Sequence, residues 1–197
     1  MKKFNIIYAD PPWTYRCGGN GSAKRHYPLM KIEDICALPV GDLAAEDCAL
    51  FLWATMPLLP EAFETIKAWG FTYKTVAFTW CKTNKNTDGY FIGMGHWTRA
   101  NAELCLLATR GKPKRQAKNV AQIIVEPRRE HSRKPDVTRE RILALMGDLP
   151  RVELFARQVP KGWDVWGNEV TPTIDFTSGH VVPKCGEEES DGLRSCS

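Results

Sequence analysis

The fold is decided by the stretch Asn5-Ile6-Ile7-Tyr8-Ala9-Asp10-Pro11-Pro12-Trp13. A short apolar run, typical of a buried strand, ends here at an acidic residue, two prolines and an aromatic residue. In an open α/β sheet, ligands bind beyond the carboxyl ends of the strands, so Asp10 is expected to face a crevice. Each proline has a fixed φ and no N–H group, so the turn is stiff and presents carbonyl oxygens. Asp10 and a proline carbonyl therefore offer two acceptors for the N–H groups of an aromatic amine.

Outward from this stretch, short apolar runs alternate with helical patterns, which predicts an α/β fold with crossover helices. Strands are expected at residues 5–9, 48–53, 73–80, 103–109, 122–125 and 151–156. Helices are expected at residues 32–38 and 59–69, the second stopped by Gly70. A third helix is expected between Asp136, which can cap its start, and Gly147, which ends it.

The 197 residues suffice for one domain with a full core but not for two ordinary ones. We expect this domain to cover residues 1–170. Beyond residue 170 the periodicity gives way to Ser, Gly, Pro and an acidic cluster, which predicts a flexible tail over residues 171–197.

The seven cysteines form no CxxC pair and no metal-type spacing, so no metal site is expected. A reduced, cytoplasmic protein is the simpler interpretation. The apolar stretches are strand-sized, so no contact with a membrane is expected. Met1 to Lys3 lead straight into the first strand, without the pattern of a signal peptide.

The polar stretch of residues 82–99 is longer than a typical connection and is a candidate functional loop. The net charge of +4 permits a polyanionic partner. Two basic clusters flank the last part of the chain's strands and, with this loop, are expected to line a groove for phosphates. The first cluster comprises Arg110, Lys112, Lys114, Arg115 and Lys118, and the second Arg128, Arg129, Arg133 and Lys134.

With its ordered motifs, the chain resembles the MT-A70 family, and its compact bacterial and phage members most. The motifs lie at residues 10–13, 50–53, 80–84, 95–97, 111–113, 131–136, 153–157 and 166–169. The resemblance implies a Rossmann-like, S-adenosylmethionine-dependent methyltransferase fold of permuted order, in which the catalytic motif comes near the N-terminus. It also implies methyl transfer to the exocyclic N6 amine of adenine in nucleic acid.

The same resemblance assigns roles to individual residues. Asp10, Pro11, Pro12 and Trp13 form the catalytic motif, and Asp10 also belongs to the S-adenosylmethionine site. Lys134 would pair with the cofactor's carboxylate, Arg157 would contact its ribose, and Asn168 and Glu169 would hold its adenine. A role of Glu153 toward the cofactor is as expected as a structural one. From the residues themselves rather than from the resemblance, Trp13 or Tyr27 is expected to stack on the target base. Lys82, on the long loop, is expected to contact the nucleic acid, and for His96 and Trp97 such contact is as expected as plain packing.

The sequence leaves three alternatives open. Compact size and resemblance to bacterial and phage members favour DNA over RNA as the substrate. A non-catalytic subunit that binds nucleic acid is less expected, because all four positions of the catalytic motif are intact. A small-molecule amine substrate fits the basic loops less well. Whether the chain acts as a homodimer or with a partner subunit stays open.

Overall fold

The computed structural model describes residues 2–14, 29–95, 97–129 and 133–176. Seven strands form one sheet in the order β5-β3-β4-β2-β1-β6-β7. The strands are β1 Phe4–Ala9, β2 Ala44–Ala54, β3 Thr72–Thr83, β4 Glu103–Arg110, β5 Ile123–Pro127, β6 Arg151–Leu154 and β7 Asp164–Trp166. The helices are α1 Ile32–Ala37, η2 Val40–Asp42, η3 Met56–Leu58, α2 Leu59–Ala68 and α3 Val137–Met146.

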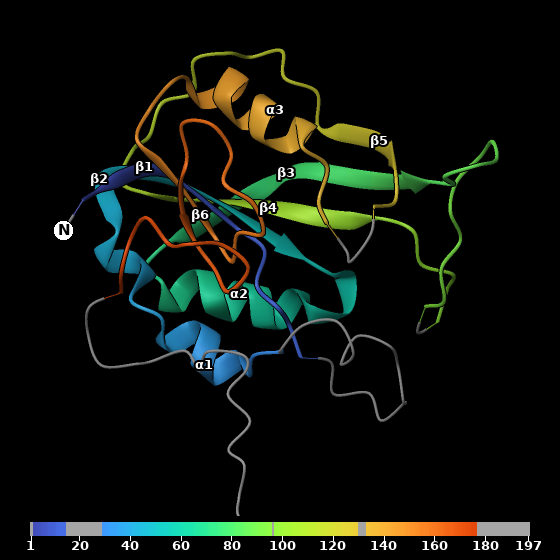
Figure 1. The fold of residues 1–197 in the computed structure, drawn as a ribbon, viewed down its shortest axis with the longest axis horizontal. Helices are drawn as coiled ribbons and strands as arrows, with labels where there is room; N and C mark the ends of the chain where they lie inside the picture. The colour runs from blue at the N-terminus through green and yellow to red at the C-terminus, as the bar shows by residue number, and fades with distance from the viewer. Residues whose placement is uncertain (1, 15–28, 96, 130–132, 177–197) are drawn as a thin grey trace, which may run out of the picture.

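All neighbouring strands pair in parallel except β4, which runs antiparallel to both β2 and β3. The helices α1 and α2 cover one face of the curled sheet and α3 covers the other (Figure 1). This arrangement of parallel strands between helices is Rossmann-like, and it places the strand with the Asp-Pro-Pro-Trp turn in the interior of the sheet, between β2 and β6.

The side chains of β1 alternate between the two faces of the sheet, and helices cover both faces, so the strand is apolar throughout. Ile7 packs with the α1 and α2 side of the core, whereas Ile6 and Tyr8 pack with Ile142 of α3. Strands with helices on both faces bury every side chain and therefore read as continuous hydrophobic runs.

The six strands and three helices predicted from the sequence are confirmed, with differences at their ends. The strand expected at residues 151–156 ends at Leu154, because Phe155 adopts a left-handed φ of 60°. The three-residue strand β7 was not predicted, since it is too short to show alternation. No helix connects β4 to β5, and none was predicted there, so that connection is a loop.

One further expectation needs correction. Asp136 stands before α3, but its side chain makes no capping hydrogen bond and its carboxylate binds other side chains instead. Two residues in the first part of the predicted tail contact β7. The backbone N–H of Thr173 donates to Val165 O at 2.9 Å, and the ring of Phe176 meets Trp166 edge to face at 4.7 Å. Of the predicted tail, residues 171–176 thus lie against β7, and residues 177–197 lie outside the described part of the chain.

Candidate active site

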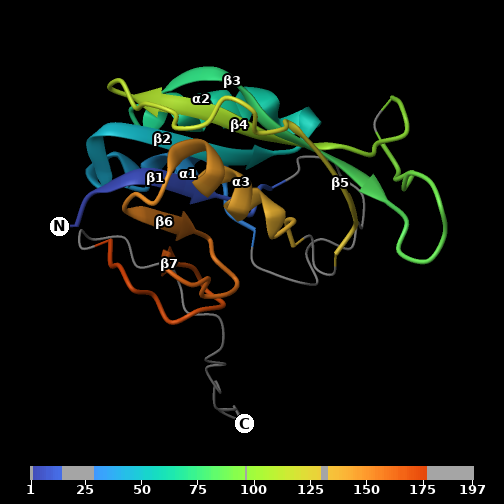
Figure 2. The ribbon, with the colours of Figure 1, turned by 90° about the horizontal axis from the view of Figure 1, so that it is seen from above.

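Strand direction brings the candidate site together at one edge of the sheet. The six parallel strands β1, β2, β3, β5, β6 and β7 end there, and the antiparallel β4 begins there (Figure 2). A cavity of about 640 Å³ opens at this edge. Its walls include Asp10, Lys134, Glu153, Phe155, Arg157 and Glu169. Five of the six residues that the sequence assigned to the cofactor therefore share one cavity; the sixth, Asn168, is exposed and does not line it.

Four charged side chains of alternating sign form a chain along this edge. The Lys134 ammonium lies 2.9 Å from Asp10 Oδ1 and 3.1 Å from Glu103 Oε2, and Lys82 pairs with the other oxygen of Glu103. Lys134 also lies over the ring of Trp53, 5.6 Å from its centroid. The sequence placed Lys82 with the substrate, but here its side chain is partly buried and supports Glu103.

Burial and neighbouring charges set the protonation of this chain. Burial raises the pKa of Asp10, and the nearby Lys134 ammonium offsets part of that rise. For Glu103 burial acts in the same direction, but Lys134 and Lys82 outweigh it and lower its pKa. Burial alone would lower the pKa of Lys134, yet its two carboxylate partners raise it, so the lysine remains a cation. Asp10 is thus a partly desolvated carboxylate held by one fixed cation.

The two prolines after Asp10 shape the turn by their carbonyl groups. Pro11 O accepts a hydrogen bond from the backbone N–H of Trp13, and Pro12 O accepts one from Met30, both at 2.9 Å. A carbonyl oxygen has two lone pairs, so each can accept a second donor. The hydrogen bonds from Trp13 and Met30 therefore fix the turn, and the carbonyl oxygens of Pro11 and Pro12 can still accept a hydrogen bond from a ligand.

Trp13 lies in the core rather than on the rim of the cavity. Its side chain is 8% exposed and its indole N–H donates to Trp53 O at 3.1 Å. A buried indole with its N–H satisfied is a packing residue, so the stacking role that the sequence suggested for Trp13 does not fit this placement. Tyr27, the other stacking candidate, lies outside the described residues.

Glu153 is held by an arginine of α3. Arg139 donates from Nε to Oε2 at 2.7 Å and from Nη2 to Oε1 at 2.8 Å, a bidentate pair. Burial raises the pKa of Glu153, and Arg139 opposes that rise. The same guanidinium lies 5.7 Å from the centroid of the Tyr8 ring. Glu153 therefore reaches the cavity as an ion already paired within the protein.

The segments after β6 and β7 lie side by side at the cavity. Arg157 Nε is 3.4 Å from Glu169 Oε1. Gly167 permits this approach, since a Cβ there would lie 2.4 Å from the backbone oxygen of Ala156. Phe155 lines the cavity at a φ that costs a non-glycine residue about 1 kcal/mol or more. Strain of this kind is concentrated at functional sites.

The loop between β3 and β4 carries the remaining substrate candidates. Trp97 is fully exposed and contacts no wall of the cavity, and His96 lies outside the described residues. The base of the loop is fixed by Asn101. Its side chain accepts from the N–H of Lys82 at 2.9 Å and donates to the Lys82 carbonyl at 2.8 Å.

The two basic clusters do not share a groove. Arg128, Arg129, Arg133 and Lys134 line the cavity. Arg110, in contrast, ends the antiparallel β4 opposite Cys48, near the beginning of β2. The first cluster therefore starts at the far edge of the sheet. The expectation of one groove was wrong because the sequence did not reveal the direction of β4.

Two residues of the site were missed in the sequence. Glu103 looked like the first residue of an apolar strand, and only the antiparallel direction of β4 brings it to Lys134. The sequence did offer one hint of the role of Arg139: it stands three residues after Asp136, a spacing that brings side chains together on a helix. In the structure the two side chains pair at 2.7 Å.

The described residues contain neither a candidate metal cluster nor a candidate membrane-spanning helix. No group of His, Cys, Asp and Glu side chains there gathers closely enough to hold a metal ion. Among the helices of the same residues, none has the length and hydropathy to cross a membrane.

Comparison with known proteins identifies the family. The MT-A70 family model matches residues 4–169. The type II methyltransferase M.MunI of Mycoplasma sp is 35% identical over 86% of this chain and 78% of its own length. The N(6)-adenosine-methyltransferase subunit METTL3 of Danio rerio is 27% identical over 99% of this chain. The N6-methyladenosine RNA methyltransferase MTA1 of Cryphonectria parasitica is 27% identical over 85% of it. The chain spans 32% of METTL3 and 52% of MTA1, but most of the Mycoplasma enzyme. The resemblance predicted from the sequence is confirmed: this chain belongs to the MT-A70 family of methyltransferases.

Proposed function

We propose that this enzyme transfers a methyl group from S-adenosylmethionine to the N6 amine of adenine in DNA. The observation that carries the proposal is the Asp10 carboxylate, held by Lys134 at the mouth of the Asp-Pro-Pro-Trp turn and facing a cavity large enough for a nucleoside. DNA is favoured because the chain spans most of the type II methyltransferase it resembles, whereas the relatives named for adenosine or RNA extend well beyond it.

The residues around the cavity fit S-adenosylmethionine by their chemistry. The cofactor carries a carboxylate, an ammonium group, a sulfonium and a ribose. Lys134 and Arg157 can bind its acidic and hydroxyl groups, while Asp10 and Glu169 supply acceptors for its cationic and hydroxyl groups. When bound, the cofactor supplies an electrophilic methyl group. Asn168, which is exposed, enters this assignment only through its neighbour Glu169.

The chain's own residues then act on the amine. The lone pair of an adenine amine is delocalised into the ring, which makes the nitrogen a poor nucleophile. Asp10 and a proline carbonyl accept its two N–H groups and favour a tetrahedral nitrogen. As the nitrogen gains positive charge, these acceptors stabilise it, and the desolvation of Asp10 strengthens that interaction. Lys134 keeps the carboxylate in place between the cavity and Glu103.

The site lies within residues 4–169, so we propose residues 1–170 as the methyltransferase domain. The proposal includes a cytoplasmic location. A homodimer or a partner subunit is compatible with it, since one relative is named as a subunit.

The test is transfer of a labelled methyl group to DNA and RNA oligonucleotides of matched sequence, with Asp10→Asn as the variant. We expect N6-methyladenine in DNA, and a loss of turnover of about 10²–10³-fold in the variant while cofactor binding persists. Label in RNA alone would replace DNA by RNA as the substrate. Cofactor binding without transfer to either polymer would support a non-catalytic subunit. Near-normal turnover by Asp10→Asn would remove Asp10 from the mechanism.

A further inference from the structure

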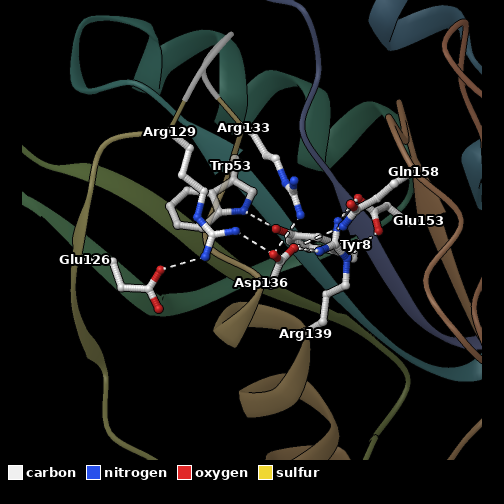
Figure 3. A network of polar contacts seen from close by, with 9 residues as sticks. All are labelled: Tyr8, Trp53, Glu126, Arg129, Arg133, Asp136, Arg139, Glu153 and Gln158. Atoms are coloured by element: carbon white, nitrogen blue, oxygen red, sulfur yellow. Dashed lines mark hydrogen bonds and ion pairs between the residues drawn. The ribbon is translucent and has the colours of Figure 1, made fainter. Parts of the chain in front are cut away.

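A single carboxylate organises the outer wall of the cavity. Asp136, directly before α3, accepts hydrogen bonds from three arginines and one glutamine (Figure 3). Its Oδ2 accepts from Arg129 and, at 2.7 Å, from Arg133. Its Oδ1 accepts from Arg139 at 2.7 Å and from Gln158 at 3.0 Å. Four donors fill the lone-pair positions of a carboxylate, so Asp136 is fully engaged by the protein.

The arginines around Asp136 divide into an inner and an outer group. The side chain of Arg139 is 12% exposed and is also bound to Glu153. The side chains of Arg129 and Arg133 are 31% and 44% exposed, and both bind the same oxygen of Asp136. Arg129 is fixed at its other end by Glu126, at 3.0 Å. Two outward-facing guanidinium groups are thus held side by side at the cavity mouth.

This arrangement suits a phosphate. A guanidinium has five N–H donors in a planar fork, and the contacts with Asp136 and Glu126 use only part of them. The fork matches the oxygens of a phosphodiester. Arg128 adds a third exposed cation to the same wall, with its guanidinium 4.4 Å from the centroid of the Phe91 ring. The inward-facing Lys134, in contrast, is held by Asp10 and Glu103.

We propose that Arg129 and Arg133 form a binding site for a backbone phosphate adjacent to the target nucleotide, and that Asp136 is the positioning residue that aligns them. The inference rests on the proposed function, since it places the substrate backbone over the outer wall while the base enters the cavity. A phosphate bound there would fix the register of the nucleic acid on the enzyme without reading its sequence.

The first test is Arg133→Gln in the full chain, measured by binding of a DNA duplex of about 20 base pairs over a range of salt concentrations. Losing one phosphate contact should weaken binding several-fold, regardless of sequence, and should reduce the salt slope by about 0.9. Arg115→Gln is the matched control, because Arg115 is an exposed arginine on the loop that leaves the far edge of the sheet. Wild-type affinity and slope for Arg133→Gln would overturn the proposal.

The second test is Asp136→Asn, for which two explanations predict opposite changes in DNA affinity. If net charge alone governed binding, removing an acidic residue would tighten the binding of a polyanion. If Asp136 positions the arginines, the variant should bind DNA more weakly, and Arg133→Gln should cost less in its background than in wild type. Tighter binding, or additive losses, would refute the positioning role. Thermal unfolding of Asp136→Asn would show whether the fold is retained, and its cofactor binding would show whether Arg139 keeps its position beside Glu153.

The outcomes also separate this inference from the proposed function. If wild type methylates DNA but Arg133→Gln binds it normally, only the phosphate site fails. If the substitution weakens cofactor binding and leaves DNA binding unchanged, the arginines serve the cofactor and the inference fails. If wild type neither binds nor methylates DNA or RNA, the proposed function fails and the phosphate site falls with it.

Discussion

Replacing Lys134 with methionine tests whether the charged chain at the sheet edge holds the site together. Methionine keeps most of the length of the lysine side chain but removes the cation between Asp10 and Glu103. Lys82 would still pair with Glu103, whereas Asp10 would lose the cation that offsets its burial. The variant therefore isolates the contribution of one ammonium group to two desolvated carboxylates.

The cost of this change depends on pH. Removing one partner of a buried ion pair destabilises a protein by about 3–5 kcal/mol. The side chains of Lys134, Glu103 and Asp10 are 10%, 12% and 24% exposed, so solvent screens this pair little. Without Lys134 the pKa of Asp10 would rise further, so the folded variant would bind a proton before the unfolded chain does. A carboxyl whose pKa is higher in the folded state than in the unfolded state lowers the free energy of unfolding above its unfolded pKa. This loss of stability disappears as the pH falls and the folded protein binds the proton. The deficit should be largest near pH 8 and shrink toward about pH 5.

Urea unfolding of wild type and Lys134→Met at the two pH values measures the deficit, with Lys134→Arg as the control that keeps the charge. We expect the arginine variant to recover part of the lost stability at both pH values. Equal stability of Lys134→Met and wild type would show that the ion pairs contribute nothing. A deficit that stays constant with pH would show that the carboxylates do not take up a proton, and the electrostatic explanation would be wrong.

Three further predictions concern residues whose placement differs from, or adds to, the expectation from sequence. Gly167→Ala should destabilise the fold by about 1–3 kcal/mol and weaken cofactor binding, because the added Cβ would lie 2.4 Å from the Ala156 carbonyl oxygen. Scanning calorimetry measures the loss of stability, and titration calorimetry measures the loss of cofactor affinity. Trp13→Leu should lower the free energy of unfolding by about 2 kcal/mol or more while leaving KM for nucleic acid unchanged, and a raised KM with normal stability would restore its stacking role. Trp97→Ala should leave stability within about 0.5 kcal/mol, since the side chain is fully exposed, and a loss of DNA affinity would then identify it as a substrate contact.

Much of the fold could be predicted because its strands are buried on both faces. Continuous apolar runs such as the one in β2 have few other interpretations, and Gly70 and Gly147 stop their helices with the positive φ expected of them. The unpredicted features depend on long-range pairing. The direction of β4 follows from its neighbours and not from its own composition, and β7 is stabilised by its pairing with β6.

Position after a strand locates only part of the candidate site, since Lys134 and Glu169 were assigned through the family resemblance. Asp10 and Arg157 follow strands that end at the cavity, so the rule for parallel sheets locates them. Glu103 escapes this rule because it begins an antiparallel strand. The role of Asp136 escaped as well, since acidic residues before helices are usually caps. Its partners Arg133 and Arg139 stand three residues to either side of it, but that spacing alone does not distinguish a cap from a residue that binds several arginines.

Because β4 is antiparallel to β3, the loop that joins them is a place where the chain can be lengthened. Both ends of the loop between β3 and β4 lie at the catalytic edge, and Asn101 joins them by hydrogen bonds to both backbone groups of Lys82. Lengthening a loop costs little entropy, about 0.6 kcal/mol for each doubling, so insertions there need not disturb the sheet. This segment can therefore vary in length or be exchanged while Lys82 and Glu103 stay in place at the edge of the sheet.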